Sequence, residues 1–159
     1  MPACADCASG AGAHTLSWQF PAESLSMSLT YSIDPAAGVV ELRYFGRQDF
    51  AEWSAVMYAI LEDPAFAEGY GFLSDRRLVS EVPTTDFVQA TLTFLRTHQA
   101  RLGASRWAAI VNDAASYGMG RMAQQLGEAL PFPIEIFTDP GRAHRWVREG
   151  GELEQTSFT

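Results

Sequence analysis

The stretch that decides the fold is "MSLTYSIDPAAGVVELRYFG", which runs from Met27 to Gly46. Its first part, "MSLTYSI" (Met27–Ile33), alternates apolar and polar residues, which is the pattern of a half-buried strand. Its last part, "VVELRYFG" (Val39–Gly46), alternates in the same way. Between them lies "DPAAG" (Asp34–Gly38), whose Pro and Gly are typical of turns. The stretch therefore predicts an antiparallel hairpin.

Directly after the hairpin the apolar period changes from that of a strand to that of a helix. "DFAEWSAVMYAILEDPAF" (Asp49–Phe66) places its large apolar residues on one helical stripe. Asp49 stands where it can cap the start of this helix, and Pro64 stands where it ends the helix. The stripe consists of Phe50, Trp53, Val56, Met57, Ile60 and Leu61.

Strands and helices then alternate through the rest of the chain. A helix capped by Thr84 or Thr85 is predicted to run to Gly103, because its apolar residues recur at helical spacing and Gly commonly ends a helix. The other predicted strands are "YGFLSD" (Tyr70–Asp75), "RWAAIVND" (Arg106–Asp113) and "PIEIFTD" (Pro133–Asp139), and the other helices are Gly118–Leu130 and Pro140–Gly150.

This order, ββαβαβαβα, predicts an α/β fold with a mixed sheet. The hairpin supplies its antiparallel part, and the strand–helix alternation supplies a parallel part with right-handed crossovers and helices packed on the sheet. We expect one domain over residues 27–150, with a flexible N-terminal tail (1–26) and a C-terminal tail (151–159).

Composition excludes several functions. The 159 residues carry 19 acidic and 11 basic side chains, a formal net charge of −8, which disfavours binding to nucleic acid or to an anionic membrane surface. Every basic residue is arginine, so there is no lysine for a Walker A loop or a Schiff base. Arginine remains, and its planar fork suits carboxylates and phosphates.

The N-terminal segment indicates neither secretion nor a strong metal site. "MPACADCASGAGA" has no basic region before its small residues, and no apolar stretch reaches the length of a membrane span. We therefore expect a cytoplasmic protein. Cys4 and Cys7 with His14 make at most half a zinc site, so we predict reduced thiols in a tail and no metal, with a metal shared between two tails as the minor alternative.

The order of elements resembles the STAS fold of anti-sigma-factor antagonists, and more closely the SpoIIAA-like (STAS/SEC14-type) bacterial family. The phrases that carry the resemblance are "GVVELRYFGRQDFAEW", "FLSDRR", "RWAAIV" and "YGMGRM", between about Met27 and Gly150. The resemblance implies a non-enzymatic module that binds a protein partner under control of a phosphorylation or, in SEC14-like relatives, encloses an apolar ligand.

One part of the family pattern is absent. Classical antagonists have an Asp-Ser-Ser-Gly type sequence at the start of the helix after the third strand, whereas this chain has "SEVPTTDF" (Ser80–Phe87). Thr84 and Thr85 are the nearest hydroxyls there. The missing motif weakens the case for a phosphorylation switch at either threonine.

The candidate site lies where the parallel strands end, because ligands of open α/β sheets bind beyond the carboxyl ends of the strands. Backbone amides at a helix start near Gly118 would add partial positive charge and favour an anion. A structural interpretation stays open: the acid and arginines could pair with one another, and the glycines could serve only a turn. The candidate ligand-binding residues are Asp75, Arg76, Arg77, Ser116, Tyr117, Gly118, Gly120 and Arg121.

A dinucleotide site is a further alternative. Gly118-x-Gly120-x-x-Ala123 follows a predicted strand, and Asp139 ends the next strand, where an acid that binds ribose is expected. The fingerprint normally opens the first strand–helix unit of a domain, whereas here only one strand and one helix follow. We therefore predict no cofactor and rank an NAD(P)-dependent enzyme last.

No catalytic constellation is visible, since no sequence pattern pairs His14, His98 or His144 with a nucleophile. We predict a non-catalytic regulatory or binding module. It would bind a protein partner or a small anionic or apolar ligand at the loops after the third and fourth strands. A lipid-type carrier with an internal apolar pocket, and Met57 and Tyr58 in a lid, is the alternative. The hairpin edge could support a homodimer.

Overall fold

The computed structural model describes residues 28–149, and these form a five-stranded sheet in the order β1-β2-β3-β4-β5. β1 pairs with β2 antiparallel, and every later pair of neighbours is parallel. The mixed α/β fold and the hairpin are therefore confirmed. The elements are β1 (Leu29–Asp34), β2 (Val39–Gly46), α1 (Phe50–Glu62), β3 (Gly71–Val79), α2 (Thr85–Thr97), α3 (Gln99–Leu102), β4 (Trp107–Ile110), α4 (Ala114–Leu126), β5 (Ile134–Phe137) and α5 (Pro140–Glu149).

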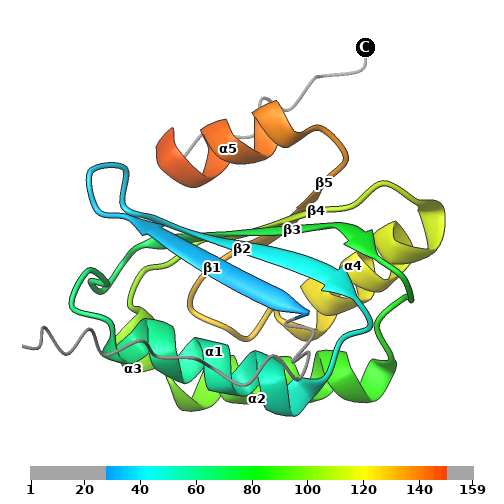
Figure 1. Ribbon diagram of the computed structural model, residues 1–159, viewed down its shortest axis with the longest axis horizontal. Helices are drawn as coiled ribbons and strands as arrows, with labels where there is room; N and C mark the ends of the chain where they lie inside the picture. Colours follow the sequence, from blue (N-terminus) through cyan, green and yellow to red (C-terminus); the bar gives the residue numbers. More distant parts are fainter. Residues whose placement is uncertain (1–27, 150–159) are drawn as a thin grey trace, which may run out of the picture.

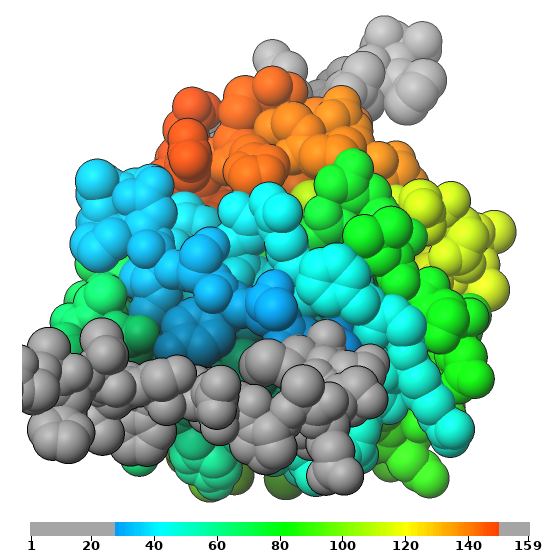
Figure 2. Space-filling view, in the orientation of Figure 1, coloured from blue at the N-terminus to red at the C-terminus, as the bar shows by residue number. Residues whose placement is uncertain are grey.

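The helices cover the two faces of the sheet unequally. α1, α2 and α4 lie on one face and α5 lies on the other (Figure 1). The parallel strands are added in one direction along the sheet, so crossovers of one hand place all their helices on one face. α5 contacts β3, β4 and β5, which leaves the same face of β1 and β2 at the surface beside it (Figure 2).

Each face of the sheet has its own apolar core. The larger core lies on the α1/α2/α4 face and includes Trp53, Met57 and Phe72, each at most 2% exposed. The smaller core lies under α5 and includes Leu73, Ala108 and Val147. Trp107 and Ala108 of β4 belong to different cores, so this central strand is covered on both sides, as its continuous apolar run predicts.

Several predicted boundaries differ from the structure. β3 continues to Val79, past the predicted end at Asp75, because the eight residues of β2 hold it in register as far as Gly46. β4 ends at Ile110, short of the predicted Asp113. The predicted helix that ends at Gly103 is divided into α2 and α3 at His98, whose backbone leaves the helical region.

The helix caps show how local chemistry sets these elements. Thr84 caps α2 as predicted, since its side chain accepts a hydrogen bond from the Phe87 amide. Asp49 occupies the N-cap position of α1, but its side chain makes no capping bond. The predicted tails and the Cys4, Cys7 and His14 group lie outside the described residues. The two end residues of the predicted domain, Met27 and Gly150, lie outside them as well.

Candidate functional site

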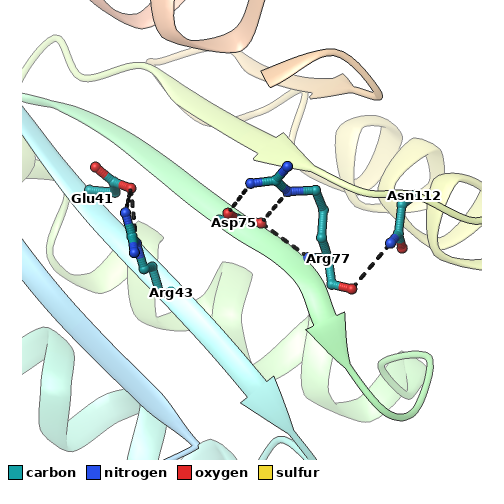
Figure 3. A network of polar contacts seen from close by, with 5 residues as sticks. All are labelled: Glu41, Arg43, Asp75, Arg77 and Asn112. Carbon is teal, nitrogen blue, oxygen red and sulfur yellow. Dashed lines mark hydrogen bonds and ion pairs between the residues drawn. The ribbon is translucent and has the colours of Figure 1, made fainter. Parts of the chain in front are cut away.

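Arg76 and Arg77 are neighbours on β3 but belong to opposite faces of the sheet. Arg77 lies on the α5 face, where its side chain turns back to Asp75 (Figure 3). Its Nε donates to Asp75 Oδ1 at 2.9 Å, and its Nη2 donates to Asp75 Oδ2 at 2.7 Å. Arg76 lies on the other face, among side chains of α2 and α4. The predicted arginine cluster is therefore divided by the sheet itself.

The pair of Asp75 and Arg77 is satisfied within the protein. Arg77 lowers the pKa of the Asp75 carboxyl, and the charge of Arg43 on the neighbouring strand acts in the same direction. Asn112 Nδ2 donates to the backbone carbonyl of Arg77, and Arg43 pairs with Glu41 (Figure 3). These exposed and half-buried contacts form a polar ladder that needs no ligand.

An irregularity in the sheet lies next to Arg76. Arg43 stands opposite Asp75 and Phe45 stands opposite Leu78, so β3 has one residue more than β2 between these pairs. Arg76 and Arg77 together therefore face the single residue Tyr44. Bulges of this kind bend a strand and are frequent beside binding sites.

Arg76 has a buried cationic group that pairs with no acid of the part of the chain that the structure describes. Its guanidinium lies 4.3 Å from the centroid of the Tyr44 ring and 5.8 Å from that of Phe87. The residue keeps some exposure, but its Nη2 atom is shielded from solvent and has no hydrogen-bond partner among the described residues. Burial lowers the pKa of Arg76, while the neighbouring Tyr44 opposes this shift. Arginine stays protonated in proteins, so the buried charge persists.

Two small cavities meet at Arg76, between the sheet and the helices. The first, the Trp107 cavity, has a volume of about 100 Å³ and is lined by Tyr44, Trp53, Ser74, Arg76, Thr91, Leu95, Trp107, Ala108, Ala109 and Ile134. The second, the Ser116 cavity, also has about 100 Å³ and is lined by Arg76, Pro83, Phe87, Val88, Thr91, Leu92, Ala109, Val111, Ser116, Met119 and Gly120. Arg76, Thr91 and Ala109 line both cavities, which places them at their junction.

Within residues 28–149, all three buried side-chain polar atoms that lack a partner belong to residues of the Trp107 cavity. They are Nη2 of Arg76, Oγ1 of Thr91 and Nε1 of Trp107. An unsatisfied buried polar atom costs about 1–3 kcal/mol, so native proteins keep few of them. Among the described residues, the polar groups that lack protein partners are therefore concentrated around this one cavity.

Related side chains elsewhere in the protein are satisfied. Thr93 and Thr97 of α2 donate to the carbonyls of Gln89 and Thr93, four residues earlier, whereas Thr91 makes no such bond. The indole of Trp53 donates to the Tyr44 hydroxyl at 3.1 Å, whereas the indole of Trp107 has no acceptor. The missing bonds are therefore a property of the cavity and not of these residue types.

The glycine pattern lies inside a helix, so the predicted helix start near Gly118 is wrong, and the loop that the dinucleotide alternative requires is not formed by these residues. α4 begins at Ala114, four residues before Gly118, because Asp113 caps it by accepting from the Ser116 amide at 2.8 Å. Hydrogen bonding from the Ser116 side chain, and after it from the Ser116 backbone amide, lowers the pKa of the Asp113 carboxyl. A Cβ atom on Gly120 would lie 2.8 Å from the side chain of Ile136 on β5, whereas one on Gly118 would meet nothing. Gly120 thus allows close packing of α4 on the sheet.

The other predicted site residues on α4 do not assemble around Arg76. Ser116 is buried and lines the Ser116 cavity, which joins it to Arg76. Tyr117 is 41% exposed, and Arg121 is exposed with its Nη1 bonded to Gln124 at 2.9 Å. Neither Tyr117 nor Arg121 lines the two cavities. Of the predicted candidates, the structure brings Arg76, Ser116 and Gly120 to one place.

Asp139 and the two threonines have local structural positions. The Asp139 carboxylate accepts from the backbone amides of Gly141 and Arg142 in the first turn of α5, so it acts as a cap and not as a ribose ligand. Thr84 caps α2, and Thr85 is its exposed first residue. The dinucleotide alternative thereby loses both its loop and its acid.

Sequence reasoning missed Tyr44, Thr91 and Trp107 as members of the site. A signal existed for Arg76, because extending the alternation of Phe72 and Ser74 by two residues assigns it to the same face. Because the predicted strand ends at Asp75, it leaves Arg76 in the loop that follows. Nothing in the sequence distinguishes Thr91 from Thr93, or Trp107 from Trp53, as polar groups without partners.

Comparison with known proteins supports the fold. The crystal structure of an uncharacterised protein of the DUF3478 family with a SpoIIAA-like fold, from Shewanella loihica PV-4, is similar at a TM-score of 0.54 and 14% identity. The match covers 76% of this chain and 94% of that one. The chain therefore has a SpoIIAA-like fold, as the resemblance predicts. No protein-family model and no curated protein matches the chain.

Proposed function

We propose that this protein is a STAS-type binding module that holds a small molecule in the Trp107 and Ser116 cavities. The observation that supports the proposal is the group of three unpartnered polar atoms around one largely apolar cavity. Ligand sites in proteins are typically apolar pockets with a few well-placed polar groups. The Ser116 cavity reaches Val111, just beyond the carboxyl end of β4, whereas the Trp107 cavity reaches Trp107, the first residue of that strand; both cavities lie beneath the helices and not in the loops.

Binding without catalysis is favoured by the chemistry of the lining. Among the described residues that line the two cavities there is no histidine, cysteine, aspartate or glutamate. General acid–base and nucleophilic catalysis rely mainly on these side chains. Arginine, threonine and tryptophan can recognise a ligand by hydrogen bonds but provide no base.

The size of the cavities favours a small ligand over a lipid. Each has about 100 Å³, well below the roughly 300–1,000 Å³ of pockets that hold drug-sized molecules. Neither Met57 nor Tyr58 is among the residues that line these cavities, as a lid over them would be. Within residues 28–149, no helix has both the length and the apolar character needed to cross a membrane.

Neutral apolar probes test this proposal without involving the charge of Arg76. We expect n-butanol or benzene, titrated into the full-length ¹⁵N-labelled protein, to shift amide resonances of β4, α2 and α4 in a saturable manner. Ala109→Leu would fill the junction of the cavities and abolish the shifts, because Ala109 lines both. Ala115→Leu is the matched control, since Ala115 is exposed on α4. Unchanged spectra of folded wild-type protein would contradict the proposal.

A homodimer through the edge of the sheet remains a separate prediction. β1 is one edge of the described sheet, and an unpaired edge can pair with a second copy. Light scattering coupled to size-exclusion chromatography would report a mass near twice 17.4 kDa if the dimer forms. A monomer mass over the whole concentration range would contradict it.

A further inference from the structure

We infer that the ligand is a small monocarboxylic acid whose carboxylate binds Arg76 in the Trp107 cavity and whose apolar body extends toward the Ser116 cavity. The inference rests on the proposed function and names the chemical class of ligand. Its basis is the buried guanidinium of Arg76, which has no acidic partner among the described residues and whose Nη2 makes no hydrogen bond to them, together with two further polar atoms that lack partners there.

The positive charge of Arg76 is not balanced by an acidic side chain of residues 28–149. Arg43, Arg47 and Arg77 each form an ion pair with a carboxylate, whereas no ion pair of Arg76 exists within residues 28–149. A buried charge is normally paired, because removing an isolated ion from water is costly. The aromatic rings of Tyr44 and Phe87 stabilise the cation, but a cation–π contact supplies only about 0.5–2 kcal/mol and brings no negative charge. A ligand with one negative charge would neutralise the site.

The three polar groups without partners around the Trp107 cavity can all act as hydrogen-bond donors. The guanidinium of Arg76 and the indole of Trp107 can only donate, and the Thr91 hydroxyl is free to donate because it does not bond to its own helix. The complementary ligand group therefore carries several acceptor oxygens. A carboxylate has two oxygens and about four lone-pair sites, and it matches the planar fork of arginine.

The number of charges in the site favours a carboxylate over a phosphate. A phosphate monoester carries a charge of about −1.5 to −2 at neutral pH, whereas a carboxylate carries a single charge. Arg76 is the single cationic residue among the described side chains that line the two cavities. The start of α4 offers no further positive end, because the Asp113 carboxylate already binds the Ser116 amide there. One cation matches one carboxylate.

The Ser116 cavity indicates the character of the rest of the ligand, beyond its carboxylate. The Ser116 cavity continues from Arg76 and Thr91 between apolar side chains of α2, β4 and α4. Val88, Leu92 and Met119 are among them and offer no polar group, and Ser116 is the one polar side chain that this cavity adds to Arg76 and Thr91. With about 100 Å³ in each cavity, a short aliphatic chain or a single aromatic ring is the appropriate size.

The test compares isosteric charged and neutral probes on the full-length protein. Butyrate and benzoate are titrated by calorimetry at neutral pH, alongside butyramide, benzamide and inorganic phosphate. We expect saturable binding of one carboxylate per chain, with a Kd about tenfold to a hundredfold below that of the matching amide, since hydrogen bonds to charged groups contribute that much. Phosphate should bind more weakly than either carboxylate.

Variants at the two adjacent arginines provide the matched control. Arg76→Met should remove carboxylate binding while Arg77→Met leaves the Kd unchanged within about twofold, because Arg77 lies on the other face of the sheet. Arg76→Lys keeps the charge but loses the fork, so it should bind carboxylates about tenfold more weakly. Circular dichroism of each variant establishes that it is folded, and Arg76→Lys serves if Arg76→Met does not fold.

The outcomes separate this inference from the proposed function. If the amides and n-butanol bind as tightly as the carboxylates, and Arg76→Met binds them equally, the cavity is a binding site but the carboxylate assignment is wrong. If phosphate binds most tightly and depends on Arg76, the ligand class is a phosphate and the assignment is again wrong. If no probe binds the folded wild-type protein, both proposals are overturned.

Discussion

Arg76 and Arg77 stand side by side in the sequence, yet they have opposite environments. Arg77 lies on the face of the sheet that α5 leaves partly open, where Asp75 neutralises it at 2.7 Å. Arg76 lies on the face that α1, α2 and α4 cover, where two aromatic rings and two cavities surround it and no acid from residues 28–149 pairs with it. The difference teaches that charges clustered along the sequence need not form one group in the fold, because adjacent residues of a strand lie on opposite faces of the sheet.

The largest expected difference in the free energy of unfolding is between variants that remove Arg76 and Arg77. We expect Arg76→Met to raise the free energy of unfolding of the unliganded protein by about 1–3 kcal/mol, because it removes a buried charge and an unsatisfied donor. Arg77→Met should lower the free energy of unfolding by less than about 1 kcal/mol, since its ion pair is partly exposed. Urea denaturation of both variants measures these changes, and a lower stability of Arg76→Met would contradict the unpaired charge.

The two glycines of α4 extend the comparison to backbone packing. Gly120→Ala should lower the free energy of unfolding by about 1–2 kcal/mol, because the new Cβ would meet Ile136 and the clash outweighs the better helix propensity. Gly118→Ala should raise it by about 0.5–1 kcal/mol, since that position is open and only the propensity changes. Thermal or urea unfolding of both variants is the measurement. Equal effects would show that Gly120 does not set the distance between α4 and β5.

A smaller difference in the free energy of unfolding is expected between variants of two threonines of α2, Thr91 and Thr93. Thr91→Val should raise the free energy of unfolding by about 1 kcal/mol, because the shape is kept and an unsatisfied hydroxyl is removed. Thr93→Val should change it by less than about 0.5 kcal/mol, since the Thr93 side chain is exposed and its bond to Gln89 lies at the surface. The same two variants can be titrated with butyrate. Weaker binding by Thr91→Val alone would assign the Thr91 hydroxyl to the ligand.

The smallest expected effect is the pH dependence of the stability contributed by the pair of Asp75 and Arg77, on the α5 face of the sheet. Arg77 lowers the pKa of Asp75 from its ordinary value of 3.8, so the pair stabilises the fold above that value. This contribution is lost as the pH falls through the lower pKa of the folded state. Asp75→Asn should therefore cost less than about 1 kcal/mol at neutral pH and nothing at a pH below both pKa values. Unfolding measured from pH 2 to pH 7 tests this sign, and a constant difference would contradict it.

The order of elements could be predicted because it depends on local signals. Strand alternation, the helical stripe around Trp53 and the turn at Pro35 and Gly38 are all encoded within a few residues. The boundaries of β3 and β4 could not be predicted equally well. The end of β3 depends on its pairing with β2 as far as Val79, and this contact joins segments far apart in the chain.

The glycine pattern shows how the same residues can have two meanings. Gly118 and Gly120 after an apolar strand match a loop that binds phosphates, but Asp113 starts the helix earlier and moves both glycines into its interior. A local motif alone could not decide between these structures. The choice depended on a cap upstream and on the position of Ile136 in β5.

The sequence by itself determined the α/β class, the antiparallel hairpin and the SpoIIAA-like order of strands and helices, because the period of apolar residues states which face of each element is buried. The tertiary structure alone decided that Arg76, Thr91 and Trp107 meet around one cavity, each with a polar atom that has no partner among the described residues. These residues come from β3, α2 and β4, and whether a buried polar atom is satisfied depends on neighbours that only the folded chain brings within hydrogen-bond distance.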